Sequence, residues 1–249
     1  MKNIKVVIVE DEAPARDLIK AYLKDVDNVE VVEECSNGFE GIKAINTHHP
    51  DLIFLDVQMP KLTGFEMLEL LDEYPQIIFT TAYDQYAIKA FELNAVDYLM
   101  KPFSKDRFMK ALEKAQQRIV EKADNKPVKE LINKVREDGG EIDRIFVKTG
   151  SRIDVIPVTD IIKIEAQDDY AEIFTKEKSF LKKETMAFLE KNLPNNNFIR
   201  VHRSAIINTD YLHKIEKYGK ETYVVILKDG SKVNVSKSRI KQLREKLGF

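Results

Sequence analysis

Five short apolar runs, each separated from the next by a stretch with helical spacing, occupy residues 4–118. The runs are IKVVIV, VEVVEE, LIFL, QIIFTT and VDYLM. Parallel strands need crossover connections, usually helices, and these connections cover both faces of the sheet. The alternation therefore predicts an α/β unit with a five-stranded parallel sheet. In such a sheet the ligand site lies beyond the carboxyl ends of the strands.

Chemically useful side chains stand at the ends of four of these runs. They are Glu10 and Asp11 after the first, Asp56 after the third, Thr81 at the end of the fourth, and Lys101 after the fifth. Three carboxylates at one sheet edge repel one another unless a cation lies among them. Mg²⁺ takes carboxylate oxygens as ligands and keeps positions for water and phosphate. The sequence therefore predicts a magnesium site.

Asp56 directly follows the buried run LIFL, where a carboxylate is costly to desolvate. A nucleophilic role explains it: Asp56 accepts a phosphoryl group, while the metal and the Lys101 ammonium neutralise the phosphoryl oxygens. Thr81 supplies a hydroxyl for the phosphoryl oxygen. Taken singly, two of these residues have simpler interpretations. Asp11 can cap the helix that follows it, and Lys101 can be a surface lysine before a proline.

The pattern changes after a charged segment at residues 119–142, which we interpret as a partly helical linker. Pro127 interrupts this segment, and Gly139 with Gly140 ends it. Residues 143–249 then alternate with period two in RIFVKT, RIDVIPV, DIIKIEAQ, YAEIFT, FIRVHRSAIIN and TYVVILKDGSKVNVS, and KDGS marks a hairpin turn. KETMAFLEKNLP and SKSRIKQLREKL are helical in pattern. We therefore predict domains at 1–118 and at 143–249, the second mainly β.

Charge is distributed unevenly along the chain. Residues 1–118 carry 14 Lys and Arg against 21 Asp and Glu, whereas residues 119–249 carry 26 against 21. From Ile199 onward the count is 12 against 5. A basic C-terminal part favours nucleic acid as the partner, although a solvated lysine-rich face produces the same count.

The cellular location is predicted from what the sequence contains. Cys35 is the single cysteine, which fits a reducing compartment. The N-terminal run does not resemble a cleavable signal, and no stretch reaches the roughly 18 apolar residues that span a bilayer. We expect a cytoplasmic protein without a membrane partner.

The motifs IVEDE, DVQMPKLTG, TTAYD and YLMKPF together resemble the receiver domain of two-component response regulators, over residues 1 to about 118. The resemblance implies a flavodoxin-like (βα)5 fold and a sensor histidine kinase as phosphoryl donor. It also implies that Asp56 is the phosphoacceptor and that Mg²⁺ is held by Glu10, Asp11, Asp56 and the backbone carbonyl of Gln58. Glu10 stands where many members have Asp, so the metal geometry differs in detail. A haloacid-dehalogenase-type phosphatase would need a second Asp where this chain has Gln58.

The resemblance further implies a switch. Thr81 and Tyr98 would form the switch pair, and Lys101 would precede a cis bond to Pro102. When Thr81 moves toward the acyl phosphate, Tyr98 swings inward from the exposed face and reshapes the surface formed by residues 82–103. That surface would bury a second copy in a homodimer. Ordinary helix packing is the alternative explanation for its Tyr86, Ala90 and Phe91.

The second half resembles the LytTR DNA-binding domain, over about 143–249, through FIRVHRSAIIN, IEAQDDYAEI and LKDGSKVNVSKSRIKQL. The resemblance implies strand-end loops that enter successive major grooves of double-stranded DNA. The candidate DNA contacts are Gln167, Tyr170, His202, Arg203, Lys237, Ser238 and Arg239. For His202 a structural role in the strand is an equal alternative. Asp168 and Asp169 face DNA unfavourably, so their loop reads bases or stays clear.

These interpretations predict a transcriptional regulator, not an enzyme, whose receiver catalyses only its own phosphorylation and dephosphorylation. Phosphorylation would drive dimerisation and DNA binding. The alternative from a different class is a phospho-regulated module that binds protein or RNA, in which the basic charge serves solubility. A steep salt dependence together with a sequence preference on duplex DNA would separate the two.

Overall fold

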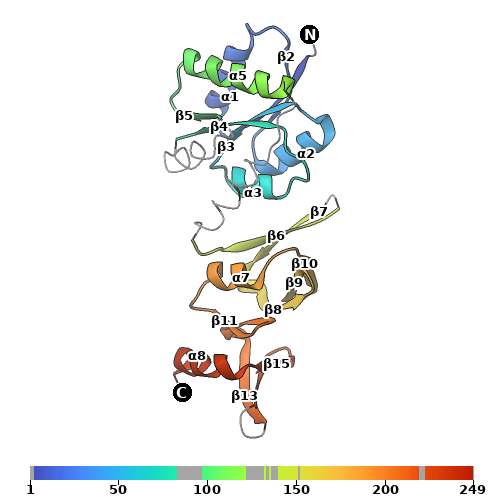
Figure 1. Cartoon of the computed structure of the whole chain (residues 1–249), viewed down its shortest axis with the longest axis vertical. Coiled ribbons are helices and arrows are strands. Elements are labelled where there is room, and N and C mark those ends of the chain that lie inside the picture. The colour runs from blue at the N-terminus through green and yellow to red at the C-terminus, as the bar shows by residue number, and fades with distance from the viewer. Residues whose placement is uncertain are drawn as a thin grey trace. The chain divides into compact units, whose positions relative to one another are not determined.

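The protein forms two compact units, residues Met1–Arg136 and Glu137–Phe249, which are described separately (Figure 1). The structure, a computed structural model, describes residues 3–82, 97–121, 132, 135, 140–150, 152–218 and 222–248. Within these residues no helix combines the length and the apolar character that a bilayer crossing requires.

The first unit is built on a parallel five-stranded sheet, in the order β2-β1-β3-β4-β5. Its strands are β1 (Ile4–Val9), β2 (Val29–Cys35), β3 (Leu52–Asp56), β4 (Gln76–Thr81) and β5 (Asp97–Met100). Its helices are α1 (Ala13–Leu23), α2 (Gly38–His48), α3 (Gly64–Glu69) and α5 (Lys105–Val120). The predicted five-stranded parallel sheet is confirmed. The predicted helix between β4 and β5 lies outside the described residues.

The helices cover both faces of this sheet because alternate strand residues are apolar on both sides. Ile8 and Phe54 face α1 and α5, and the Phe54 ring stacks on Phe108 with centroids 5.1 Å apart. On the opposite face Phe65 of α3 packs against Phe79, with centroids 5.2 Å apart. A strand buried on both faces reads as a nearly continuous apolar run. Such runs are residues 6–9 of β1, 52–55 of β3 and 77–79 of β4.

Side-chain caps fix where two of these helices begin. Ser104 accepts a hydrogen bond from the amide of Arg107 at the start of α5. Thr63 and Glu66 form a capping box at the start of α3, in which each side chain bonds the other residue's backbone amide. The α3 cap holds the loop that follows Asp56 and so helps to position the carboxyl edge of the sheet.

The second unit is mainly β, as predicted. A five-stranded antiparallel sheet has the order β10-β9-β8-β12-β11, a three-stranded sheet has the order β13-β14-β15, and β6 pairs with β7. The strands are β6 (Arg144–Thr149), β7 (Arg152–Pro157), β8 (Ile161–Gln167), β9 (Tyr170–Thr175), β10 (Ser179–Lys182), β11 (Phe198–His202), β12 (Ala205–Asn208), β13 (Leu212–Tyr218), β14 (Thr222–Leu227) and β15 (Lys232–Val235). The helices are α7 (Met186–Asn192) and α8 (Lys237–Leu247), with short 3-10 turns η1 (Val158–Asp160) and η2 (Thr209–Tyr211).

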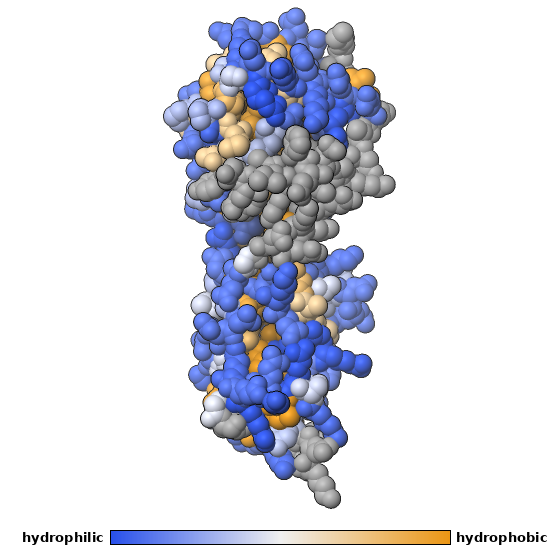
Figure 2. Space-filling view, turned by 60° about the vertical axis from the view of Figure 1, so that its left-hand side comes forward, coloured by the Kyte–Doolittle hydropathy of each residue, from blue (hydrophilic) through white to orange (hydrophobic). Residues whose placement is uncertain are grey.

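Two apolar cores lie on opposite faces of the five-stranded sheet. Ile164 and Ile206 point to the core shared with β6, β7 and α7. Ile162 and Ile207 point to the core shared with β14, β15 and α8. Ile162 and Ile164 are two positions apart, so strict alternation would place both on one face. The register shift between Ile161 and Lys163 allows the run DIIKI to supply both cores. On the face shown in Figure 2 the described surface is mostly hydrophilic, with apolar side chains in small separate areas.

The KDGS turn is confirmed as the hairpin between β14 and β15, with Gly230 at a φ of +83°. The pattern FIRVHRSAIIN is not one continuous strand. It reverses at Arg203 and Ser204 to form the antiparallel pair β11 and β12, whose register shifts between Arg200 and His202. Strands β10 and β13 were not predicted from the sequence.

Candidate functional site

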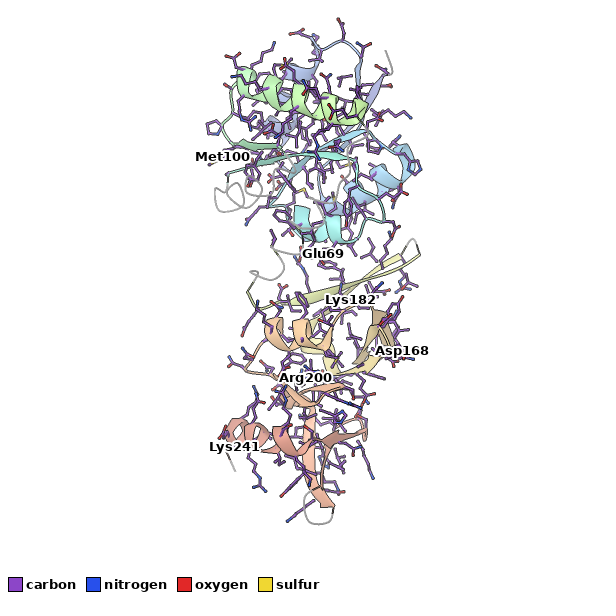
Figure 3. The ribbon with its side chains drawn as sticks, viewed as in Figure 1. Glu69, Met100, Asp168, Lys182, Arg200 and Lys241 are labelled. Atoms are coloured by element: carbon purple, nitrogen blue, oxygen red, sulfur yellow. The ribbon has the colours of Figure 1, made fainter. Side chains whose placement is uncertain are left out.

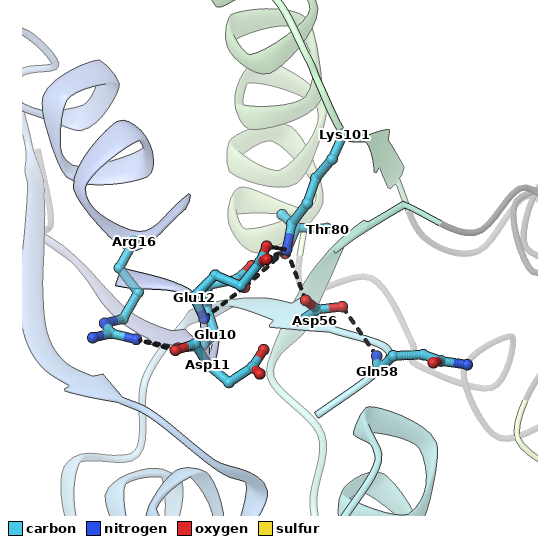
Figure 4. Close-up of polar contacts among 8 residues, drawn as sticks. All are labelled: Glu10, Asp11, Glu12, Arg16, Asp56, Gln58, Thr80 and Lys101. Carbon is cyan, nitrogen blue, oxygen red and sulfur yellow. Dashed lines mark hydrogen bonds and ion pairs between the residues drawn. The ribbon is translucent and has the colours of Figure 1, made fainter. Parts of the chain in front are cut away.

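Three carboxylates meet at the carboxyl edge of the parallel sheet. One oxygen each of Glu10, Asp11 and Asp56 lies within 4.8 Å of the others (Figure 4). Glu10 is fully buried and Asp56 is 5% exposed. The three carboxylates thus lie together at one edge of the sheet, as the sequence pattern predicted.

Lys101 joins this cluster from the end of β5. Its Nζ lies 2.8 Å from Glu10, 2.7 Å from Asp56 and 3.3 Å from Glu12. Burial lowers the pKa of Lys101, but the hydrogen bonds to Asp56 and Glu10 outweigh burial and raise this pKa overall. Lys101 is therefore a partly buried cation of the site, bound to its carboxylates, and not a free surface lysine. The Lys101–Pro102 bond is cis.

The carboxyl group of Glu10 has a raised pKa. Burial raises its pKa to about 7; the hydrogen bond from Lys101 opposes this rise, and the charge of Asp56 adds to it. The hydroxyl of Thr80 donates to Glu10 over 3.3 Å. Near neutral pH this carboxyl group is poised between its protonated and ionised forms, and a cation that binds it would favour the ionised form.

Arg16 and Glu12 belong to the site although the sequence interpretation did not select them. The guanidinium of Arg16 donates to the backbone carbonyls of Glu10 and Asp11, over 2.6 and 3.0 Å. These bonds tie the acidic loop to the first turns of α1. Glu12 is the N-cap residue of α1, with no side-chain capping bond, so Asp11 does not cap this helix.

Backbone geometry around Asp56 depends on two neighbours. The amide of Gln58 donates to Asp56 Oδ1 over 3.0 Å. Gly64 lies so close that a Cβ atom there would stand 2.3 Å from the carbonyl oxygen of Asp56. The final glycine of DVQMPKLTG thus allows α3 to approach the end of β3.

The predicted switch residues lie next to this site. Thr81 is fully buried at the end of β4, and its carbonyl accepts the amide of Lys101 over 2.8 Å. Tyr98 is only 9% exposed, with its ring centroid 6.1 Å from that of Phe79. The expectation of an exposed Tyr98 that later turns inward is therefore wrong for this structure, because the ring is already buried. Tyr86, Ala90 and Phe91 lie outside the described residues.

In the second unit the three segments predicted to contact DNA are adjacent. The amide of Ala166, before the β8–β9 turn, donates to the carbonyl of Ser204 in the β11–β12 turn over 2.9 Å. The amide of Ser236, before α8, donates to the carbonyl of Val201 over 2.8 Å. The β11–β12 turn therefore lies between the β8–β9 turn and the start of α8.

Most of the predicted contact side chains on this edge are exposed. Those exposed to solvent are Gln167, Tyr170, Arg203, Lys237 and Ser238. His202 is half-buried, and its Nδ1 lies 2.7 Å from the Ser204 hydroxyl. Asp168 and Asp169 are also exposed, with Asp168 at the β8–β9 turn at a φ of +51° (Figure 3).

Arg239 is half-buried and bound within the chain. Its guanidinium nitrogens lie 2.7 and 3.4 Å from the carboxylate of Glu190 on α7. No sequence pattern indicates this pairing, since the two residues are 49 positions apart. Arg239 is consequently a less available DNA contact than Arg203.

Comparison with known proteins matches both units. Residues 6–113 match the family described as response regulator receiver domain, and residues 151–248 match the LytTr DNA-binding domain. The chain is 34% identical over 247 residues to the sensory transduction protein LytT of Bacillus subtilis, covering 98% of this chain and 99% of LytT. It is 35% identical over 249 residues to the transcriptional regulatory protein BtsR of Escherichia coli K12, covering 99% of this chain and all of BtsR.

A solved structure, the response regulatory domain of mrkE from Klebsiella pneumoniae, is 31% identical with a TM-score of 0.44. It covers 47% of this chain and 99% of that domain. The two matched families and their order define a two-component response regulator with a DNA-binding output domain. The chain belongs to the LytTR family of response regulators.

Proposed function

We propose that Asp56 accepts a phosphoryl group from a phosphohistidine of a sensor histidine kinase. A carboxylate oxygen of Asp56 would attack phosphorus, the phosphorus–nitrogen bond would break, and the histidine would leave. The observation that carries this proposal is the position of the Lys101 ammonium between Asp56 and Glu10. There it can neutralise charge on the transferred group.

The donor set fits a resident Mg²⁺. Three carboxylates with oxygens within 4.8 Å supply hard oxygen ligands. Burial, with a smaller contribution from the charge of Asp56, raises the pKa of Glu10, and a bound cation would favour its ionised form. We propose Glu10, Asp11, Asp56 and the carbonyl of Gln58 as its ligands. Bound magnesium would supply charge neutralisation for the phosphoryl oxygens. Arg16 would hold the loop that carries Glu10 and Asp11 through its two carbonyl contacts.

Neighbouring residues would then change their contacts in response to the acyl phosphate. Thr81 is at the end of β4 beside the site, so its hydroxyl is suited to bond a phosphoryl oxygen. Tyr98 occupies β5, the next strand, and would pass the change from its buried position beside Phe79 to the surface that residues 82–103 are proposed to form. Homodimerisation through that surface remains our proposal, as does its dependence on phosphate.

For the output domain we propose binding to duplex DNA through the edge where the β8–β9 turn, the β11–β12 turn and the start of α8 meet. Arg203 and His202 would contact bases, and Lys237, Ser238 and Arg239 would contact bases or phosphates. Gln167 and Tyr170 would contact DNA from the third segment. Residues 1–118 would be the receiver, 119–142 the linker and 143–249 the DNA-binding domain.

One experiment tests both halves of the proposal. Bound sequences are selected from a random duplex pool with the full chain, with and without beryllofluoride and Mg²⁺. A repeated motif bound more tightly with the analogue would support both roles and their coupling. Absence of any enriched sequence would contradict the DNA-binding proposal and favour a protein or RNA partner for the basic domain.

A further inference from the structure

Glu190 on α7 receives hydrogen bonds from arginines on two different elements. One carboxylate oxygen lies 2.8 Å from Arg200 of β11, and the other lies 2.7 Å from Arg239 of α8. The two guanidinium groups share a single acidic partner. Without Glu190 they would meet as like charges, which is unfavourable.

Arg200 connects this carboxylate to the β11–β12 turn. Its Nε donates to the carbonyl of His202 over 3.3 Å, and its second terminal nitrogen donates to the carbonyl of Arg203. The Arg200 side chain is 16% exposed and extends from β11, against which both α7 and α8 pack (Figure 3). The guanidinium thus holds the backbone of the two residues expected to read bases, at the point where the strand register shifts.

Arg239 connects the same carboxylate to the start of α8. It also donates to Gln242 over 3.0 Å, one turn further along the helix. Lys237 and Ser238 precede it in this first turn. Glu190 therefore links two of the three segments of the proposed DNA-binding edge, through one arginine each.

Helix α7 holds Glu190 in a fixed place. Thr185 caps the helix by accepting the amide of Phe188 over 3.1 Å, and Leu189, the preceding residue, is buried in the core. A cleft of about 320 Å³, lined by Glu190, Arg200 and Gln242, lies open beside the network. The carboxylate is therefore positioned by a capped and packed helix and remains 30% exposed, close to a surface proposed to bind a polyanion.

We propose that Glu190 is a positioning residue for DNA recognition. Its carboxylate orients the guanidinium of Arg200, which donates to the carbonyls of His202 and Arg203, and it also orients Arg239. The turn that carries the base-reading residues is therefore ordered before DNA binds. This inference rests on the proposed DNA-binding function. It has an unusual consequence: an acidic residue close to the phosphates should favour specific binding while opposing nonspecific binding.

The test is Glu190→Gln in the full chain. The probes are a duplex selected by the wild-type chain and a scrambled duplex of the same composition. Gln keeps the size of the side chain but removes its charge. We expect affinity for the selected duplex to fall about 10-fold, the scale of one good base contact, while affinity for the scrambled duplex stays equal or rises. Glu245→Gln is the matched control, since Glu245 lines the same cleft but pairs with Lys241.

If Glu190 acted only through its charge, or only by stabilising the fold, the two variants would give different results. If Glu190→Gln strengthened binding to both duplexes equally, as Glu245→Gln should, the positioning role would be refuted. Arg200→Lys provides a second variant that keeps the charge and loses the forked donors. It should lose preference for the selected duplex with an unchanged salt slope, and retention of that preference would also refute the proposal.

The outcomes separate this inference from the function on which it rests. A wild-type chain that selects no sequence would overturn both. A wild-type chain that selects a sequence, with both variants keeping its preference at unchanged thermal stability, would overturn the inference alone.

Discussion

The ammonium nitrogen of Lys101 lies 2.7 Å from a carboxylate oxygen of Asp56, although the two residues are 45 positions apart in the sequence. The parallel sheet creates this contact, because β3 and β5 flank β4 and all three end at one edge. The same ammonium lies 2.8 Å from Glu10. One partly buried ammonium group therefore offsets part of the negative charge of the site.

Asp56→Ala should abolish labelling by acetyl phosphate, because no other carboxylate in the site is proposed as acceptor. Folding should be preserved, since the substitution removes a charge that is costly to bury. Labelling is measured by phosphate-affinity electrophoresis or intact mass. Asp25→Asn is the control, as Asp25 is an exposed partner of Lys105. If the Asp56→Ala variant is still labelled by acetyl phosphate, Asp56 is not the acceptor.

Lys101→Met should slow phosphorylation by about 10²- to 10³-fold, the usual cost of removing a preorganised group that stabilises transition-state charge. Met keeps much of the side-chain volume but has no charge. Single-turnover labelling with acetyl phosphate measures the rate. Lys105→Met serves as control, because this lysine is exposed and lies on α5 outside the site. An unchanged rate in Lys101→Met would remove Lys101 from the proposed chemistry.

Magnesium affinity should depend on pH through Glu10. Its pKa is raised to about 7, so the proton must leave before the carboxylate can act as a ligand. Below pH 7 the protonated form predominates and affinity should fall by about tenfold per pH unit; above pH 7 it should level off. Calorimetric titration in buffers of different ionisation heat measures affinity and released protons together. Glu10→Gln should bind Mg²⁺ weakly and without this pH dependence; a wild-type affinity constant from pH 6 to 8 would contradict the assignment.

Much of the fold could be predicted because apolar residues recur in the sequence with the spacing of strands or of helices. The four residues before Asp56 and the three residues before Thr80 are all apolar, as expected of strands buried on both faces. Strands β10 and β13 were missed for a physical reason. Both are edge strands, and their order comes from pairing with β9 and β14 more than from an apolar pattern of their own.

The sequence predicts only those site residues that stand directly at the ends of strands. Parallel topology brings Glu10, Asp56 and Lys101 together whatever lies between them. The contribution of Arg16 could not be foreseen, because it bonds backbone carbonyls that any sequence would supply. Likewise the Glu190–Arg239 pair depends on how α7 and α8 pack against β11, which no local pattern records.

Gly64→Ala should destabilise the receiver by about 1–3 kcal/mol, the usual cost of forcing an extra methyl into a packed site. The added Cβ would meet the carbonyl oxygen of Asp56 at 2.3 Å, and backbone atoms cannot move away as a flexible side chain can. Urea unfolding measures the change. Gly140→Ala is the matched control, since no atom lies within 4 Å of the corresponding Cβ. Equal stabilities for the two variants would mean that α3 does not need to approach Asp56 so closely.

Arg203→Ala should weaken binding to the selected duplex by about 1–3 kcal/mol if this side chain reads a base. Arg203 is exposed in the turn that lies between the other two segments of the edge, so it is well placed to enter a groove. Affinities for the selected and scrambled duplexes are compared at fixed salt. Arg152→Ala is the control, because Arg152 is an exposed arginine on β7 that pairs with Asp154 outside these segments. A base contact must discriminate between sequences. If Arg203→Ala instead weakened affinity for both duplexes equally and reduced the salt slope by about one, Arg203 would be a phosphate contact.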